Sequence, residues 1–286
     1  MEFKLTIMRI KISDDQWIWL FKLIGGFLLF GFLYGIALSP SLLEIDAAVS
    51  AAFMLVFIIL VTLAYVGWIK LTEKRKCSEL SLRKLLPDTI QGLATGSIYF
   101  ITVVGIMMLL GAYSIKTTDF NAGEQLKNFV FFFGVAVCEE IMFRGILFRM
   151  MDRKWGFVKA LIISALLFGF VHITNDNATL WSAFAISIEA GLLFGTIYKW
   201  CNNLWMPIGI HWAWNYLQGN VFGFEVSGTD SGSSIITPEI TGHELITGGS
   251  FGAEASVISV IIGIAFTLFF LQMIRKGELI KENTNI

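Results

Sequence analysis

Residues 126–148 read LKNFVFFFGVAVCEEIMFRGILF and decide the class of fold. The stretch is long enough to cross a hydrocarbon layer as a helix, which takes about 20 apolar residues, yet it carries Glu139, Glu140 and Arg144. On the membrane-insertion scale these three charges oppose insertion by roughly 8–10 kcal/mol, whereas the Leu, Ile, Phe and Val residues return only about 4–8 kcal/mol. We therefore expect other membrane helices to enclose this one, with its charges facing the bundle interior or a wet cavity.

The amino-acid composition of the whole chain is also typical of a membrane protein rather than of a water-soluble one. Apolar residues make up 56% of the 286 positions and charged residues only 15%, against about 25% charged residues in a soluble domain. This composition excludes a soluble enzyme, a secreted disulfide scaffold and a disordered chain. We expect an all-α, polytopic membrane helical bundle in which residues 1–286 form one domain, with a motif-bearing core at about 126–222. Apolar runs predict about eight transmembrane helices, near Trp17–Leu38, Ala47–Ile69, Ile90–Ala112, Leu126–Phe148, Phe157–Ile173, Trp181–Tyr198, Pro207–Phe222 and Val257–Ile274.

The distribution of Lys and Arg orients this bundle in the membrane. With the N- and C-termini cytoplasmic, sixteen of the 21 Lys and Arg residues fall in cytoplasmic segments, and only Lys116 and Lys127 fall in outer loops, as the positive-inside rule requires. The net charge of −1, without a large basic region, argues against nucleic acid as a partner and leaves the lipid bilayer as the expected one. The acidic outer segment at about 223–255, rich in Gly, Ser and Thr, is expected to be a surface loop or a cap over the bundle.

Helical geometry gives the two adjacent glutamates different neighbours. Residues four apart lie on one face of a helix, so Glu140 stacks beside Arg144 and can form an ion pair that orients the helix. Glu139 points about 100° away and has no cation three or four positions along the chain. A buried carboxylate without a cationic partner is the better proton acceptor, so Glu139 is the candidate for proton transfer. The alternative is that both acids belong to one structural charge cluster.

Two of the three histidines lie in apolar helical sequence. His172 ends the run from Phe168, and His211 begins the stretch HWAWN, which puts Asn215 on the same face as His211. A single buried histidine is usually a satisfied core residue, but two of them together with an acid pair favour a reactive site. The predicted boundaries put His172 near the end of its span and His211 near the start of its own. The two imidazoles would then differ in depth, unless a segment is re-entrant, the helices tilt strongly or the short spans are misplaced.

These residues resemble the motifs of a known family. Glu139-Glu140-x-x-x-Arg144, Phe168-x-x-x-His172 and His211-x-x-x-Asn215, in this order on separate helices, are similar to the CPBP family of intramembrane endopeptidases, which includes the type II CAAX prenyl protease and the bacteriocin-processing (Abi) enzymes. The resemblance implies that Glu139 activates a water for attack on a peptide carbonyl, and that His172 holds or deprotonates this water. It implies that His211 and Asn215 donate hydrogen bonds to the oxyanion, while Glu140 and Arg144 set the geometry. The stretch Gly248-Gly249-x-x-Gly252-x-Glu254 also resembles a feature of some bacterial members.

The resemblance implies an intramembrane protease, a multi-pass hydrolase of the cell (cytoplasmic) membrane that cleaves a membrane-associated protein or peptide. The substrate stays open between a prenylated protein, a bacteriocin and a signalling peptide, and the oligomeric state is not readable. Two histidines and a carboxylate could also bind a divalent metal such as zinc, with Glu139, His172 and His211 as its ligands. We expect that no cofactor is required, because Asn215 beside His211 suits an oxyanion site better than a ligand set.

Two other kinds of protein stay open as alternatives. Intramembrane acids and histidines also mark ion paths, and Glu189 in the sixth predicted span fits a membrane transporter or a proton-relay protein. Such transporters usually show repeated halves with broken helices, which we do not find in this sequence. The other alternative is a non-enzymatic bacteriocin-immunity or scaffold protein in which the acids serve binding.

Overall fold

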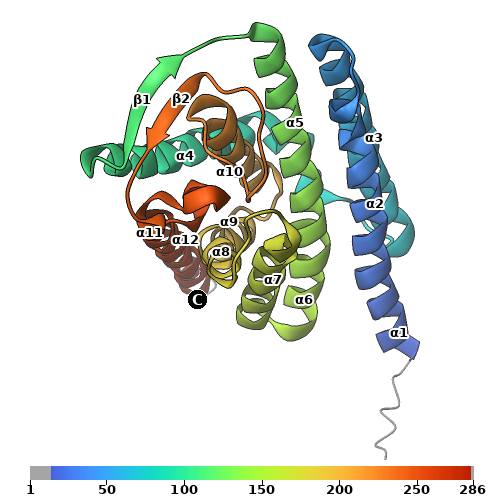
Figure 1. The fold of residues 1–286 in the computed structure, drawn as a ribbon. Coiled ribbons are helices and arrows are strands. Elements are labelled where there is room, and N and C mark those ends of the chain that lie inside the picture. Colours follow the sequence, from blue (N-terminus) through green and yellow to red (C-terminus); the bar gives the residue numbers. More distant parts are fainter. Residues whose placement is uncertain (1–13, 285–286) are drawn as a thin grey trace, which may run out of the picture.

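Long apolar stretches become helices throughout residues 14–284, the part of the chain that the structure, a computed structural model, describes (Figure 1). The predicted cytoplasmic N-terminus depends partly on Lys4, Arg9 and Lys11, which lie outside this range. Four π-helical turns, Phe21–Gly25, Ile141–Phe148, Ser187–Leu192 and Leu217–Val221, continue neighbouring helices. The α-helices are α1 (Asp14–Leu20), α2 (Gly26–Leu38), α3 (Ala47–Thr72), α4 (Leu82–Leu109), α5 (Ala122–Glu140), α6 (Arg149–Trp155), α7 (Phe157–Val171), α8 (Leu180–Ile186), α9 (Leu193–Cys201), α10 (Trp205–Tyr216), α11 (Glu244–Thr247) and α12 (Val257–Thr284).

The predicted all-α polytopic membrane fold is confirmed, and all eight predicted spans correspond to helices. Six helical segments within residues 14–284 are long and apolar enough to cross a membrane on their own: Asp15–Leu42, Ala47–Thr72, Leu82–Leu109, Phe157–Thr174, Leu180–Cys201 and Val257–Gly277. The other two predicted spans, 126–148 and 207–222, are the more polar helices that carry the acid pair and the His211 motif. These two helices depend on the apolar helices around them.

The helix that carries the acid pair is enclosed in the bundle, as its charge content predicts. α5 continues through the π-turn Ile141–Phe148 into α6. Between Gly134 and Met151 every residue is buried except Glu139. α5 packs against α2 and α3 on one side and against α10 on the other. The single partly exposed position on this buried stretch therefore marks where the protein leaves space next to the helix.

Glycines bring α4 and α10 into backbone contact. A Cβ atom on Gly92 would lie 2.4 Å from the carbonyl oxygen of Met206, and one on Gly96 would lie 2.6 Å from that of Ile210. From the other side, a Cβ on Gly209 would lie 2.5 Å from the carbonyl oxygen of Thr89. Small residues permit this close approach between membrane helices. Because Ile210 precedes His211, the contact also fixes the height at which His211 stands in the bundle.

The outer segment 223–255 folds as a cap rather than as an unstructured surface loop. Its strand β2 (Ile236–Ile240) pairs antiparallel with β1 (Tyr113–Thr118), and Tyr113 stands opposite Ile240. The two strands lie beside α4 and α10, with α11 below them (Figure 1). The end of the segment returns to the bundle, where residues 251–256 are buried.

Candidate active site

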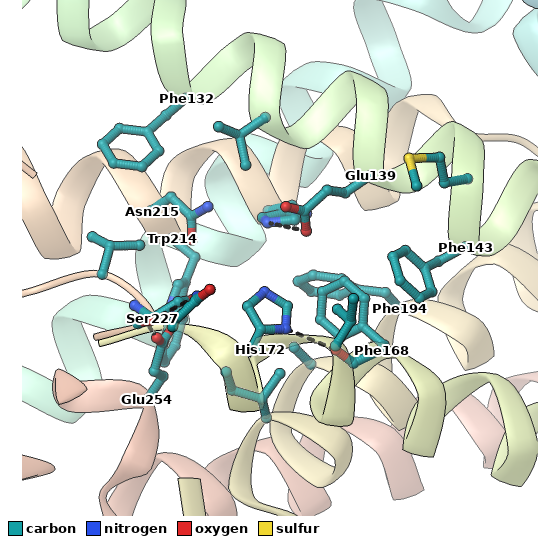
Figure 2. A pocket seen from close by; sticks show the side chains of 18 of the residues that line it. Phe132, Glu139, Phe143, Phe168, His172, Phe194, Trp214, Asn215, Ser227 and Glu254 are labelled. Carbon is teal, nitrogen blue, oxygen red and sulfur yellow. Dashed lines mark hydrogen bonds and ion pairs between the residues drawn. The ribbon is translucent and has the colours of Figure 1, made fainter. Parts of the chain in front are cut away.

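The residues predicted to carry the chemistry meet at one cavity. It has a volume of about 390 Å³ and is lined by Glu139, His172, His211 and Asn215 together with apolar and aromatic side chains. Figure 2 shows Glu139, His172 and Asn215 converging on this space from three different segments. A volume of this size is typical of small-ligand and substrate pockets, and it exceeds by far the roughly 30 Å³ that one water occupies.

Glu140 and Arg144 form the predicted ion pair next to the cavity. Arg144 Nη1 donates to Glu140 Oε1 at 2.9 Å, and both side chains are almost fully buried. The Arg144 guanidinium also lies 4.3 Å from the centre of the Phe168 ring and 5.0 Å from that of Phe194. Its second nitrogen, Nη2, donates to the carbonyl oxygen of Ala190 at 3.2 Å. Through these contacts the pair joins the acid helix to α7 and to the π-turn Ser187–Leu192.

Glu140 also holds His211. The Nδ1 atom of His211 lies 3.1 Å from Glu140 Oε1, and its Nε2 atom lies 3.9 Å from Glu139 Oε2. Because an ionised carboxylate can only accept, Nδ1 carries the proton in this contact. The imidazole is therefore fixed by Glu140 at one nitrogen and presents the other nitrogen toward Glu139.

Glu139 has few partners of its own. Tyr34 of α2 donates its hydroxyl proton to Glu139 Oε1 at 3.2 Å, while Glu139 Oε2 has no hydrogen-bond partner among the described residues. Tyr34 was missed by the sequence reasoning, because it lies in an apolar span 105 positions earlier and no motif marks it. A carboxylate oxygen that faces a cavity without a partner is available to a small polar molecule.

His172 presents its free ring nitrogen to the cavity. Its Nδ1 atom lies 2.7 Å from the carbonyl oxygen of Phe168, and because a carbonyl only accepts, Nδ1 carries the proton. In the neutral ring Nε2 is then a lone-pair acceptor. Figure 2 shows this ring between Glu139 and the opposite wall of the cavity.

The expected difference in depth between the two histidines does not occur. His172 directly follows the last residue of α7 (Phe157–Val171), and it lines the same cavity as His211. His211 lies in the middle of α10 and its π-turn Leu217–Val221, and Phe168 packs on both imidazole rings.

Asn215 follows His211 by one turn and lines the same cavity. It is 6% exposed, and no side-chain partner is present for its amide within residues 14–284. The π-turn Leu217–Val221 begins two residues later, and other π-turns follow Glu140 and contain Glu189. Single π-turns within α-helices are frequent at functional sites, and two of the four π-turns here, Ile141–Phe148 and Ser187–Leu192, contribute residues to the cavity lining.

Two further acids line the cavity and were given no catalytic role from sequence. Glu189 accepts from the Tyr99 hydroxyl at 3.3 Å, and Glu254 accepts from the backbone N–H of Ser227. The glycine-rich stretch before Glu254 was the available signal for the second acid. Periodicity alone could not show that the outer segment returns to the site.

The residues do not fit a metal centre as they stand. No group of three or more His, Cys, Asp or Glu side chains within residues 14–284 is close enough to hold a metal ion. The predicted zinc ligands were Glu139, His172 and His211. Only His211 Nε2 and Glu139 Oε2 approach each other, at 3.9 Å, and within residues 14–284 His172 is not close enough to complete a group of three ligands.

Comparison with known proteins supports the resemblance seen in the motifs. Residues 124–217 match the family described as type II CAAX prenyl endopeptidase Rce1-like. The chain is also 30% identical over 115 residues to the Bacillus subtilis (strain 168) protein named "Putative membrane peptidase YdiL", and the alignment covers 40% of this chain and 42% of that protein. No solved structure matches this chain. The matched segment contains both glutamates, the arginine, both histidines and the asparagine of the three motifs.

Proposed function

We propose that this chain, a multi-pass membrane protein with an Rce1-like segment of the CPBP type, is an endopeptidase that hydrolyses a peptide bond in a membrane-associated protein or peptide. The observation that carries the proposal is the convergence of Glu139, His172, His211 and Asn215 on one cavity. These side chains come from three separate helical segments, and a merely structural role would not require them to share an open space.

In the proposed reaction Glu139 is the general base. Its Oε2 atom is without a protein partner among the described residues, and it takes a proton from a water in the cavity. His172 Nε2 accepts the second hydrogen bond of that water and so directs its lone pair at the peptide carbonyl. The water oxygen bonds to the carbonyl carbon, the C–N bond then breaks, and Glu139 returns its proton to the leaving nitrogen. General base catalysis of this kind contributes typically about 10²–10⁴-fold to the rate.

His211 and Asn215 stabilise the negative charge that develops on the carbonyl oxygen. Asn215 supplies an N–H of its amide, and His211 supplies Nε2–H when its ring carries both protons. Glu140 and Glu139 face the two nitrogens of His211 and so fix the direction of the ring. Such donors are worth about 2.7–4 kcal/mol each in the barrier. Arg144 balances Glu140 and orients it against His211.

The cavity lining favours a hydrophobic substrate. Phe132, Val135, Met142 and Phe143 of the acid helix line it together with Phe27 of α2. A peptide segment with apolar side chains, held near the cytoplasmic face of the cell membrane, fits this surface. Whether the natural substrate is a prenylated C-terminus, a bacteriocin or a signalling peptide is decided by comparing the peptides of cells that carry wild type with those that carry Glu139→Ala.

The decisive test uses the purified protein in lipid nanodiscs and a panel of fluorogenic peptides with membrane-proximal cleavage sites. Wild type is expected to cut at least one peptide, and Glu139→Gln is expected to lower kcat by about 10²-fold or more, because the amide cannot accept the proton. Glu124→Gln on an outer turn of the same helix is the matched control. Equal cleavage by wild type and Glu139→Gln would refute the proposal.

A proton relay is the second candidate, because Glu139, Glu189 and Glu254 line the same cavity. Chains of buried acids conduct protons in pumps and transporters. Proteoliposomes that hold a pH-sensitive dye separate the two functions. A relay would carry protons and lose this flux in Glu189→Gln, whereas a peptidase would keep cleaving in that variant without any flux.

A further inference from the structure

The cap contributes Val226, Ser227, Thr229 and Glu254 to the cavity lining, and Ser227 is hydrogen-bonded to two other lining residues. The backbone N–H of Ser227 donates to Glu254 Oε1, and its carbonyl oxygen accepts from Asn175 Nδ2 at 2.9 Å. Ser227, Glu254 and Asn175 all line the cavity. One residue of the cap is therefore held at both ends of its backbone by side chains from two distant segments.

Asn175 belongs to the turn that carries His172. The short 3-10 turn His172–Thr174 ends at Asn175, whose backbone N–H donates to the carbonyl oxygen of His172 at 3.0 Å. Within residues 14–284 the one hydrogen bond of the His172 ring is to the Phe168 carbonyl oxygen, and the Phe168 ring packs against it. A displacement of Asn175 would therefore be passed to His172 through a single turn of backbone.

The next residues strengthen the same junction. Gly228 has a φ of +78°, and a Cβ there would lie 1.9 Å from the carbonyl oxygen of Asp176. Asn177 Nδ2 donates to the carbonyl oxygen of Gly228 at 3.3 Å, and the Gly228 N–H donates to that of Phe251 at 2.8 Å. Ser227 itself has a φ of +52°, a left-handed conformation that a serine keeps only when its surroundings impose it.

Glu254 is the buried end of this chain of contacts. It is 3% exposed, and the backbone on either side of it is fixed: Gly252 has a φ of +115°, and the carbonyl oxygen of Ala255 accepts from Trp181 Nε1 at 2.7 Å. Burial raises the pKa of Glu254 to about 7, although the Ser227 N–H and His211 act to lower it. Both the neutral and the ionised carboxyl can accept the Ser227 N–H.

We propose that Glu254 is a positioning residue of the candidate active site, which acts through Ser227 and Asn175 to hold His172 in place. This inference deepens the proposed function and rests on it for its kinetic part. In this arrangement the cap fixes the end of α7 through the hydrogen bonds of Ser227 with Glu254 and Asn175. Phe168, on α7 itself, fixes the His172 ring through its carbonyl oxygen.

The test compares Glu254→Ala with Glu254→Gln, since the glutamine retains a carbonyl oxygen that can accept the Ser227 N–H but cannot supply a proton. Glu254→Ala is expected to lower kcat by about 10- to 100-fold with KM nearly unchanged, because small misplacements of a reacting group cost rates of this order. Glu254→Gln is expected to restore most of the wild-type kcat. Glu239→Ala, which removes an exposed acid from the same cap, serves as the control.

A double variant tests the connection itself. Asn175→Ala is expected to lower kcat to a similar extent, and Asn175→Ala/Glu254→Ala is expected to be no worse than either single change, because both release the same residue. Independent losses that multiply in the double variant would overturn the inference. A Glu254→Gln variant as inactive as Glu254→Ala would also overturn it, in favour of a role for the proton or the charge.

Amide hydrogen exchange provides a readout that does not need peptidase activity. In Glu254→Ala the amides of residues 172–176 are expected to exchange faster than in wild type, whereas the amides of α3 keep their wild-type rates. In the Glu239→Ala control, exchange at residues 172–176 is expected to stay unchanged. Unchanged exchange at 172–176 would overturn the inference even in an active enzyme. Conversely, the wild type could cut no peptide while Glu254→Ala still exchanges faster at residues 172–176. That result would refute the proposed function and leave the positioning contact established.

Discussion

The two adjacent glutamates are predicted to lose different properties when each is changed to glutamine: Glu140→Gln loses stability, and Glu139→Gln loses activity. Glu140 lies between Arg144 and His211 and is 0% exposed. Glu140→Gln removes the charge that balances the Arg144 guanidinium, and leaving one partner of a buried ion pair uncompensated costs about 3–5 kcal/mol. Glu139→Gln removes a carboxylate whose one hydrogen bond among the described residues comes from the Tyr34 hydroxyl, so we expect its effect on stability to stay within about 1 kcal/mol.

Thermal unfolding in detergent and peptide cleavage measure the two effects separately. At roughly 2–4 °C per kcal/mol for a chain of this size, Glu140→Gln is expected to lower Tm by about 6–20 °C. Glu139→Gln is expected to keep Tm within a few degrees and to lose cleavage by about 10²-fold or more. A Tm loss of equal size in both variants would refute the reasoning, since it would mean that the two acids form a single structural cluster.

Three further predictions address packing, pH and metal. Gly92→Ala is expected to destabilise the protein by at least about 1–3 kcal/mol, because the new methyl meets the carbonyl oxygen of Met206; Gly105→Ala in the same helix meets nothing within 4 Å and is expected to be neutral or slightly stabilising in the same thermal assay. Burial would raise the pKa of Glu73, but its hydrogen bonds to Arg149 and Arg75 outweigh burial and lower the pKa from 4.5 to about 2. This depressed pKa stabilises the fold fully above pH 4.5, and the stabilisation is lost as the pH falls toward 2; the Tm difference between wild type and Glu73→Gln should therefore shrink over that range. Finally, a chelator series on the purified protein is expected to leave cleavage intact, and loss of cleavage that zinc restores would overturn the expectation that no cofactor is required.

The chemistry-bearing elements could be predicted because they depend on local spacing. The four-residue separation of Glu140 and Arg144 is enough to place them on one helical face, and the ion pair is present. The charge content of 126–148 likewise indicates an enclosed helix, and the structure encloses it. These inferences need only the period of a helix and the cost of a charge in lipid.

The convergence of the helices could not be predicted in the same way. It depends on where α7 ends, which brings His172 to the cavity, and on the glycine contacts that fix α10 against α4. Both are tertiary facts that hydropathy does not encode. The contributions of Tyr34 and Glu254 are harder still to predict, because Tyr34 lies 105 positions before Glu139 and Glu254 reaches the cavity from the far end of the outer segment.

The burial of α5 has a consequence for biogenesis. A ribosome releases α2 and α3 before α5, so the acid helix emerges next to two apolar helices against which it packs in the final bundle. The later partners of its charges, Ala190 and His211, are not yet synthesised at that moment. Because Glu140 and Arg144 pair within one helix, their charges can be neutralised before the later helices are synthesised. This pairing lowers the cost of inserting the nascent helix into the membrane at that stage.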